Sequence, residues 1–173
     1  MNNQAKPSSG LSGVFWPMVL VCVVLMAGVL LRPRPQLATG QRLPPLMAEG
    51  WLNSQGPPLV EGKVVVVDAW FTRCGPCLQS LPRMAELHRK WARDERVVFV
   101  GLTFEPGGML PDIQRVMGRV DGFDWPVGYG ASPTLDLLGV EMYPTLILFD
   151  KSGVSVWTGH SVAELDNQLE ALL

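Results

Sequence analysis

The stretch KVVVVDAWFTRCGPC, residues 63–77, decides the fold of this chain. Its consecutive valines predict a strand over 63–70, and an apolar run without alternation is typical of a strand covered on both faces in a parallel or mixed sheet. The run ends at a Cys-Gly-Pro-Cys turn, and apolar residues then recur at helical spacing over 77–93, which predicts an amphipathic helix. A second apolar run over 97–103 completes a β-α-β unit, so we expect two parallel strands.

Further along the chain the pattern predicts a helix over 112–119 and a short strand near Val127. Apolar runs at 145–149 and 154–158 surround a turn sequence, Asp-Lys-Ser-Gly, and should pair as an antiparallel hairpin. Ser161, followed three residues later by a glutamate, is a good N-cap for a final helix. Strands and helices in this order predict an α/β domain.

Length and composition limit the classes of protein that remain. The chain has 173 residues, which suits one ordinary domain with an appendage. Its 14 Lys and Arg against 16 Asp and Glu give a net charge of −2, without the basic surface that nucleic-acid binding needs. The hydrophobic content of 47% excludes an intrinsically disordered chain.

The apolar excess is concentrated at the N-terminal end. Residues 14–31 carry no charge, and as a helix these 18 residues rise about 27 Å, close to the roughly 30 Å of a bilayer core. We therefore expect a polar segment over 1–13, a membrane anchor over 14–31, a Pro- and Gly-rich linker over 32–50 and the folded domain over 51–173.

A cleaved signal peptide is the alternative interpretation of the apolar segment, although no small-residue cleavage site follows it closely. Both interpretations export the remainder of the chain if the N-terminus stays inside. Charge does not decide the orientation, because Lys6 and the terminal amine on one side are matched by Arg32 and Arg34 on the other.

Two of the three cysteines lie outside the apolar segment, at Cys74 and Cys77. A thiol at a strand-to-helix junction meets the helix N-terminus, where free N–H groups and the helix dipole stabilise a thiolate. Cys74 is therefore the candidate nucleophile. Cys77, one turn along, can attack a mixed disulfide at Cys74 and release the partner, so it is the candidate resolving thiol.

Half of a zinc site is the alternative for this pair, but zinc normally takes four ligands and only His88 and His160 remain as histidines. His88 lies about 16 Å along the helix from Cys77, too far to share an ion with it. We expect His88 to be a packed, hydrogen-bonded side chain instead. No metal and no organic cofactor is predicted.

Two blocks carry a family resemblance. VVVDAWFTRCGPCLQSLP, residues 65–82, resembles the active-site region of thioredoxin-like proteins, and YPTLILFDKSGVSVWTGH, residues 143–160, resembles their cis-proline strand and following hairpin. With the apolar N-terminal segment, the chain is similar to membrane-anchored thiol–disulfide oxidoreductases of the TlpA/ResA type over residues 51–173. The resemblance implies a thioredoxin fold, a central mixed sheet flanked by helices, behind an N-terminal transmembrane helix.

The resemblance also implies roles for particular residues. Asp68 matches a buried acid that accepts or relays the proton of Cys77, and Pro144 matches the cis-proline that faces the cysteine pair and leaves backbone groups free for a substrate. Tyr143 lies beside that proline on the substrate side. Trp70 matches an aromatic residue beside the site, and a plain core tryptophan fits the sequence equally well.

Two positions depart from the family pattern. Arg73 replaces the tryptophan that commonly precedes the first cysteine, and it favours a Cys74 thiolate if it points that way. Ser80 stands where the anchored proteins often carry a glutamate, which puts a second active-site acid in doubt.

The function expected from the resemblance is dithiol–disulfide exchange with exported proteins at the outer face of the cytoplasmic membrane, as a reductant. Electrons would come from an integral-membrane donor, and c-type apocytochromes are one class of substrate. The main alternative is a non-catalytic interaction or chaperone module of the same fold. A peroxidase is disfavoured because Phe71 occupies the place of the usual threonine three residues before Cys74, and a metal-delivery protein is the third alternative.

Overall fold

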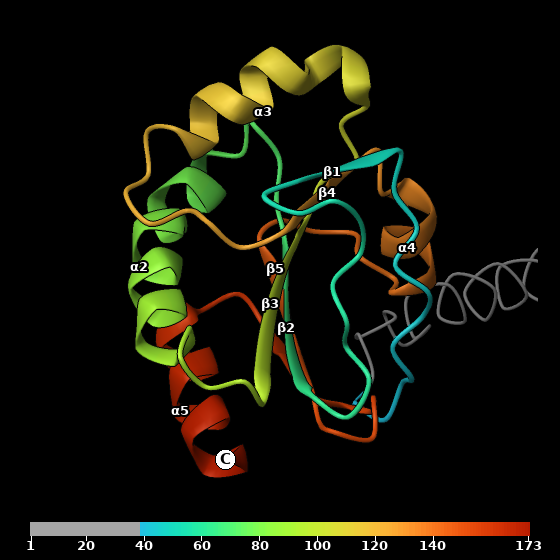
Figure 1. Cartoon of the computed structure of the whole chain (residues 1–173), viewed down its shortest axis with the longest axis vertical. Helices are drawn as coiled ribbons and strands as arrows, with labels where there is room; N and C mark the ends of the chain where they lie inside the picture. The colour runs from blue at the N-terminus through green and yellow to red at the C-terminus, as the bar shows by residue number, and fades with distance from the viewer. Residues whose placement is uncertain (1–38) are drawn as a thin grey trace, which may run out of the picture. The chain divides into compact units, whose positions relative to one another are not determined.

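A mixed sheet of six strands is the framework of residues 39–173, the part of the chain that the computed structural model describes (Figure 1). The strands follow the spatial order β1-β4-β3-β2-β5-β6. Their bounds are β1 (Gly50–Leu52), β2 (Val64–Ala69), β3 (Val97–Leu102), β4 (Val127–Tyr129), β5 (Thr145–Phe149) and β6 (Ser155–Gly159).

Strand β2, the valine run of the sequence, lies in the interior of the sheet. It pairs in parallel with β3, with Val64 opposite Val97, and antiparallel with β5, with Val65 opposite Phe149. All six residues of β2 are buried. The expected parallel β-α-β unit and the expected β5–β6 hairpin are both confirmed.

Helices cover both faces of the sheet, and alternation along β2 sends its side chains to each face in turn. Val64 and Val66 pack with apolar residues of α2 and α5, whereas Val65 and Val67 pack with those of α4. Figure 1 shows α2 and α5 together on one side of the strands and α4 on the other. The helices are α2 (Gly75–Trp91), α3 (Leu110–Met117), α4 (Ser132–Leu137) and α5 (Val162–Leu172), with a 3₁₀ turn η1 (Gly107–Met109) before α3.

The N-cap expected at Ser161 is present, because its hydroxyl accepts the backbone N–H of Glu164 at 3.4 Å. Three short elements have no counterpart in the sequence interpretation. Strand β1 and the turn η1 have three residues each and α4 has six, so all three are too short for a periodic pattern to develop.

The prediction of a linker over residues 32–50 is wrong for residues 40–50, which make hydrogen bonds with the folded domain. The Gly40 N–H donates to the Ser155 carbonyl at 2.7 Å, and the Leu43 N–H donates to the Gly153 carbonyl at 2.8 Å. The Met47 N–H donates to the Thr134 hydroxyl at 2.7 Å. Residues 40–50 are thus fixed to the β5–β6 hairpin and to α4, so the folded unit begins before residue 51.

The predicted polar segment 1–13 and membrane anchor 14–31 lie outside the described residues, as does the start of the predicted linker. Among residues 39–173, the helices do not combine the length and the apolar character that crossing a membrane requires.

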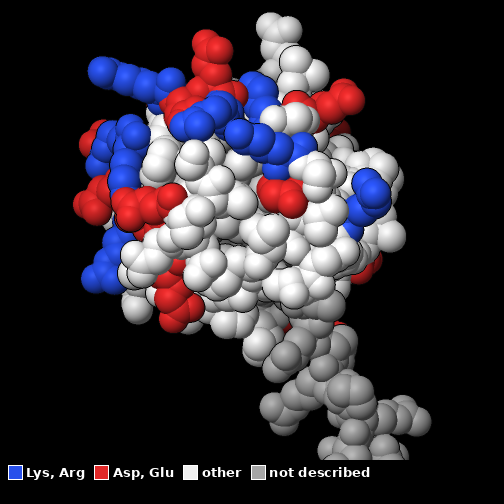
Figure 2. Space-filling view, turned by 90° about the horizontal axis from the view of Figure 1, so that it is seen from below, with Lys and Arg blue, Asp and Glu red and all other residues white. Residues whose placement is uncertain are grey.

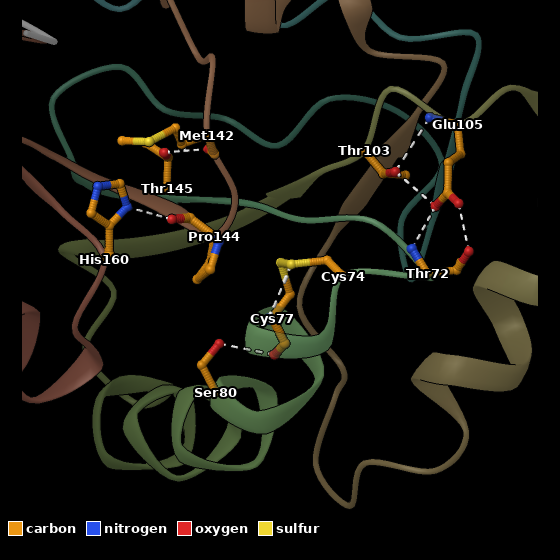
Figure 3. The surroundings of a disulfide bond; sticks show 10 residues. All are labelled: Thr72, Cys74, Cys77, Ser80, Thr103, Glu105, Met142, Pro144, Thr145 and His160. Atoms are coloured by element: carbon orange, nitrogen blue, oxygen red, sulfur yellow. Dashed lines mark hydrogen bonds between the residues drawn. A yellow bond between two sulfur atoms is a disulfide. The ribbon is translucent and has the colours of Figure 1, made fainter.

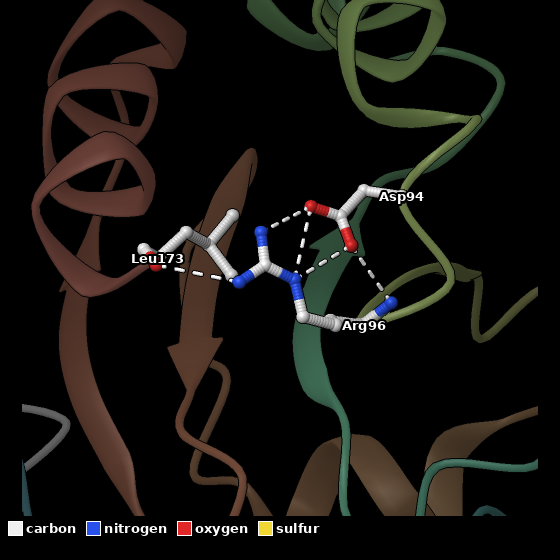
Figure 4. Close-up of polar contacts among 3 residues, drawn as sticks. All are labelled: Asp94, Arg96 and Leu173. Atoms are coloured by element: carbon white, nitrogen blue, oxygen red, sulfur yellow. Dashed lines mark hydrogen bonds and ion pairs between the residues drawn. The ribbon is translucent and has the colours of Figure 1, made fainter.

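Charged side chains of both signs are mixed at the end of the sheet where β2 and β3 begin, the face seen in Figure 2. Lys90 of α2 reaches Asp166 of α5 at 2.8 Å. Arg96 binds Asp94 at 2.6 Å and donates to the Leu173 carbonyl at 3.4 Å (Figure 4). Hydrogen bonds from Arg96 lower the pKa of Asp94 to about 2. These contacts connect the α2–β3 loop to the C-terminal helix, far along β2 from the cysteine pair.

Candidate active site

The two cysteines of the Cys-Gly-Pro-Cys turn form a disulfide at the start of α2 (Figure 3). Cys74 is the N-cap of the helix, and its Sγ accepts the backbone N–H of Cys77 at 3.1 Å. A sulfur at a helix N-terminus lies where free N–H groups and the helix dipole favour negative charge. The geometry therefore suits Cys74, once reduced, to carry a thiolate.

The sequence builds this start from a tight turn. The Cys74 N–H donates to the Phe71 carbonyl at 3.1 Å, and the Cys74 carbonyl accepts the Leu78 N–H at 3.0 Å as the first bond of the helix. Pro76 stands in the first turn, where its missing N–H costs no intrahelical bond. Cys74 is only 4% exposed, so the side chains around it control access to the sulfur.

Asp68 lies on β2, six residues before Cys74, and is 3% exposed. Burial raises the pKa of its carboxyl from 3.8 to about 7. Within residues 39–173, its Oδ2 has no hydrogen-bond partner. A carboxyl of this kind changes its protonation near neutral pH and is therefore suited to proton transfer.

The Tyr143–Pro144 peptide bond is cis, as the resemblance implied. The Pro144 carbonyl lies 2.5 Å from Nδ1 of His160, and the Thr145 hydroxyl donates to the Met142 carbonyl at 2.6 Å. Figure 3 draws the Pro144 ring between His160 and the disulfide. The loop before β5 is thus held at the carbonyls of Met142 and Pro144, and its contact with His160 was not foreseen from the sequence.

Three aromatic rings from three different loops meet next to the turn that leads into Cys74. Phe71 lies 5.3 Å from both Phe104 and Tyr143, and Phe104 lies 5.6 Å from Tyr143, measured between ring centroids. Phe104 is 40% exposed, and Met142 beside Tyr143 is also exposed. Burial raises the pKa of Tyr143, with a smaller contribution from the Asp136 charge. This apolar surface suits a polypeptide more than a charged small molecule.

Trp70 is not part of that surface. It is fully buried and packs against Phe123, with 5.5 Å between ring centroids. Of the two interpretations open for Trp70, the structure favours the core tryptophan, so the proposed contact with substrate is corrected. The signal was ambiguous because Trp70 directly follows β2, a strand that is buried on both faces.

The structure places Arg73 and Ser80, the two departures from the family pattern, at the start of α2. Arg73 is exposed. Ser80 donates its hydroxyl to the Cys77 carbonyl at 2.9 Å, in the first turn of α2.

His88, the histidine weighed as a metal ligand, is packed against Phe99 and Trp125, and its Nδ1 lies 2.9 Å from Asp124. Residues 39–173 contain no group of three or more His, Cys, Asp or Glu arranged to hold a metal ion.

Sequence reasoning missed Glu105, which lies in the loop after β3. It is 5% exposed, and its carboxylate accepts the N–H of Thr72 at 2.9 Å, the hydroxyl of Thr72 at 2.5 Å and the hydroxyl of Thr103 at 3.1 Å (Figure 3). No local signal marks this residue, because a glutamate after a strand is usually exposed.

The cysteine pair thus caps a helix next to a central strand, with a cis-proline loop alongside, as the resemblance to thioredoxin-like proteins implied. The thioredoxin-like family profile matches residues 62–154, which is more than half of the chain. The chain therefore belongs to the thioredoxin-like family, and its fold is the thioredoxin fold.

Individual relatives share only part of their length with this chain. Protein FixW of Rhizobium leguminosarum is 38% identical over 82 residues, which cover 46% of this chain and 36% of FixW. Thiol-disulfide oxidoreductase ResA of Halalkalibacterium halodurans is 26% identical over 117 residues, covering 66% of this chain and 64% of ResA.

Among solved structures, a putative thiol:disulfide interchange protein DsbE from Chlorobium tepidum superposes with a TM-score of 0.64 at 24% identity. The superposition covers 80% of this chain and 100% of that protein. At this identity the likeness establishes the fold.

Proposed function

We propose that this chain is a thiol–disulfide oxidoreductase that uses Cys74 and Cys77 to reduce disulfides in exported proteins. The observation that carries the proposal is the disulfide itself, whose first sulfur caps α2 and accepts the Cys77 N–H at 3.1 Å. The similarity to ResA supports the same chemistry.

In the proposed reaction the reduced protein attacks a substrate disulfide through the Cys74 thiolate. A Cys74–substrate disulfide forms and one substrate sulfur leaves as a thiolate. Cys77 then loses its proton and attacks the Cys74 sulfur, so the Cys74–Cys77 disulfide forms and the second substrate thiolate leaves. Two electrons pass to the substrate, and an external dithiol must return them.

Asp68 is proposed to accept the proton that Cys77 releases, because burial raises the pKa of Asp68 to about 7 and leaves it partly ionised near neutral pH. The loop of Tyr143 and Pro144 is proposed to contact the substrate polypeptide, since it carries part of the apolar surface beside the turn.

The setting of the reaction is also a proposal. Residues 14–31 would anchor the chain in the membrane, with the thioredoxin domain on the outer face of the cytoplasmic membrane. An integral-membrane dithiol protein would supply electrons, and apocytochromes with a reducible cysteine pair are one class of substrate. If residues 14–31 anchor the chain, it should stay with the membrane fraction during alkaline extraction. If the thioredoxin domain lies on the outer face, protease added to intact cells stripped of the outer barrier should degrade it.

Turnover of a disulfide-bonded protein by the purified full-length chain, with dithiothreitol as donor, tests the proposed activity. Replacing Cys77 by serine should trap a covalent complex with the substrate through Cys74, whereas Cys74→Ser should trap none. A chain that forms no mixed disulfide in either variant would contradict the proposal. Equilibration with glutathione gives the direction: about −270 mV supports a reductant and about −120 mV an oxidant.

A non-catalytic interaction module is the second candidate, and the 4% exposure of Cys74 is the observation that favours it. Alkylation of the reduced chain near neutral pH separates the two. A Cys74 thiol that reacts no faster than free cysteine supports the module, and a faster one supports the oxidoreductase.

A further inference from the structure

Glu105 is a buried charged residue for which the exchange reaction has no use. Its two carboxylate oxygens accept three hydrogen bonds, two from Thr72 and one from Thr103. Its own N–H donates to the Thr103 hydroxyl at 3.3 Å, and its carbonyl accepts the Gly130 N–H at 2.7 Å. Taking a carboxylate out of water is costly even when it is hydrogen-bonded, so an apolar side chain here would be the simpler way to stabilise the fold.

The contact of Glu105 with Thr72 lies within the turn that sets the nucleophile. Thr72 follows Phe71, whose carbonyl accepts the Cys74 N–H at 3.1 Å and closes the turn. Glu105 binds both the backbone N–H and the hydroxyl of Thr72, at 2.9 and 2.5 Å, and so fixes the position and the orientation of this residue. Figure 3 shows Thr72 on the chain segment that leads into Cys74, with the carboxylate of Glu105, which belongs to the loop after β3, directed toward it.

We propose that Glu105 is a positioning residue: through Thr72 it holds the Phe71–Cys74 turn so that the Cys74 sulfur stays at the N-terminus of α2. The inference rests on the proposed function, because only a reacting sulfur needs this placement. Held there, a Cys74 thiolate keeps the N–H of Cys77, 3.1 Å away in the disulfide form, as a hydrogen-bond donor. Released from Glu105, the turn shifts and the thiolate loses part of that stabilisation.

Two variants separate the hydrogen bonds of Glu105 from its charge. Both remove the negative charge, but only one of them keeps a hydrogen-bond acceptor for Thr72. In Glu105→Gln the amide oxygen still accepts the Thr72 N–H, and the amide nitrogen can donate to the Thr72 hydroxyl. In Glu105→Met a side chain of similar length offers no acceptor, so the buried Thr72 N–H is left unpaired. Other charged groups of this strand and turn, Asp68 and Arg73, are unchanged in both variants.

The measurement is the rate at which iodoacetamide alkylates Cys74 in the reduced full-length chain, followed from about pH 5 to pH 9. Mass spectrometry of the peptides distinguishes Cys74 from Cys77 and Cys22. In Glu105→Met the midpoint of the pH profile should move upward and labelling at pH 7 should slow by about three- to tenfold, the equivalent of one hydrogen bond. Glu105→Gln should stay within about twofold of the natural chain.

Two other results overturn the proposal. If both variants move the midpoint downward by the same amount, Glu105 acts on the thiolate through its charge alone. If neither variant moves the midpoint while both lower the free energy of unfolding, Glu105 only stabilises the fold.

A second pair of variants decides the matter if Glu105→Met does not fold. Thr72→Val removes one hydroxyl donor to Glu105, and it should slow labelling of Cys74 in the same direction by a smaller factor, whereas Thr72→Ser keeps both donors and should label normally. Equal rates in the two variants contradict the proposal. Glu49→Gln is the matched control, because Glu49 also binds the backbone of this loop, at the Gly107 N–H, 2.8 Å away, without touching Thr72.

Alkylation does not require turnover. A chain that reduces no protein disulfide, yet shows the expected difference between Glu105→Met and Glu105→Gln, would refute the proposed function and leave the positioning role intact.

Discussion

Replacing Asp68 by asparagine should stabilise the oxidised protein at alkaline pH and have much less effect at acid pH. Asp68 is buried at 3% exposure, and burial raises the pKa of its carboxyl from 3.8 to about 7. Between these two values the folded chain holds a proton that the unfolded chain has lost. Stability therefore falls as the pH rises through this window and becomes level above it.

The size of the effect follows from the shift. One unit of pKa corresponds to about 1.4 kcal/mol, so a rise of about three units gives at most about 4 kcal/mol of lost stability at pH 8. Asparagine carries no charge, and the variant should escape this loss. The free energy of unfolding of Asp68→Asn, relative to the natural chain, should increase by up to about 4 kcal/mol between about pH 4 and pH 8.

Guanidinium unfolding of the oxidised full-length chain at several pH values measures this difference, with Asp121→Asn, at a fully exposed carboxylate, as the matched control. The control should show no comparable trend. A difference between Asp68→Asn and the natural chain that is the same at pH 4 and pH 8 would refute the reasoning, because it would mean that Asp68 is not protonated in the folded state. Loss of protein-disulfide turnover in Asp68→Asn, with mixed-disulfide formation retained, would support its proposed role in resolution.

Three further predictions concern other parts of the described chain. His160→Leu should raise KM for a protein disulfide a few-fold while Cys74 alkylation stays unchanged. His160→Asn, whose amide can donate to the Pro144 carbonyl, should restore KM. Equal KM values in the two variants would mean that the hydrogen bond to Pro144 has no role in substrate binding. Thr134→Val removes the acceptor of the Met47 N–H, so limited proteolysis should cut residues 40–50 faster and stability should fall by about 1–3 kcal/mol. Burial lowers the pKa of His88 despite a nearby carboxylate, so stability should fall as the pH drops below about 6.5, and His88→Gln should flatten this acid-side slope in a denaturation series.

The elements that sequence predicts well are those whose signal is local and long enough to repeat. The valine run at 63–70 carries its burial in its composition, and β2 is indeed buried on both faces. The hairpin of β5 and β6 follows from its turn residues, and the N-cap at Ser161 from its side chain. In each case the residues that make the signal also make the contacts.

Residues 40–50 were misassigned for the opposite reason. Their attachment is made by backbone N–H and carbonyl groups that pair with 153–155 and with Thr134, and backbone pairing leaves little trace in a Pro- and Gly-rich stretch. Glu105 was missed because its donors on Thr72 are 33 residues away in the sequence. Only the packed sheet, which places β2 beside β3, brings these two loops together.

Phe104 and Glu105 are adjacent in the loop after β3, and we expect them to affect different properties of the site. Cys74 is 4% exposed, whereas Phe104, which contacts Phe71 at the start of the same turn, is 40% exposed. Phe104 therefore affects access, through its contacts with Phe71 and Tyr143, whereas Glu105 faces inward and affects where the Cys74 sulfur lies. Because Phe104 is exposed and Glu105 is buried, a substitution at one of them can change the proposed substrate contact while the other keeps the proposed stabilisation of the thiolate.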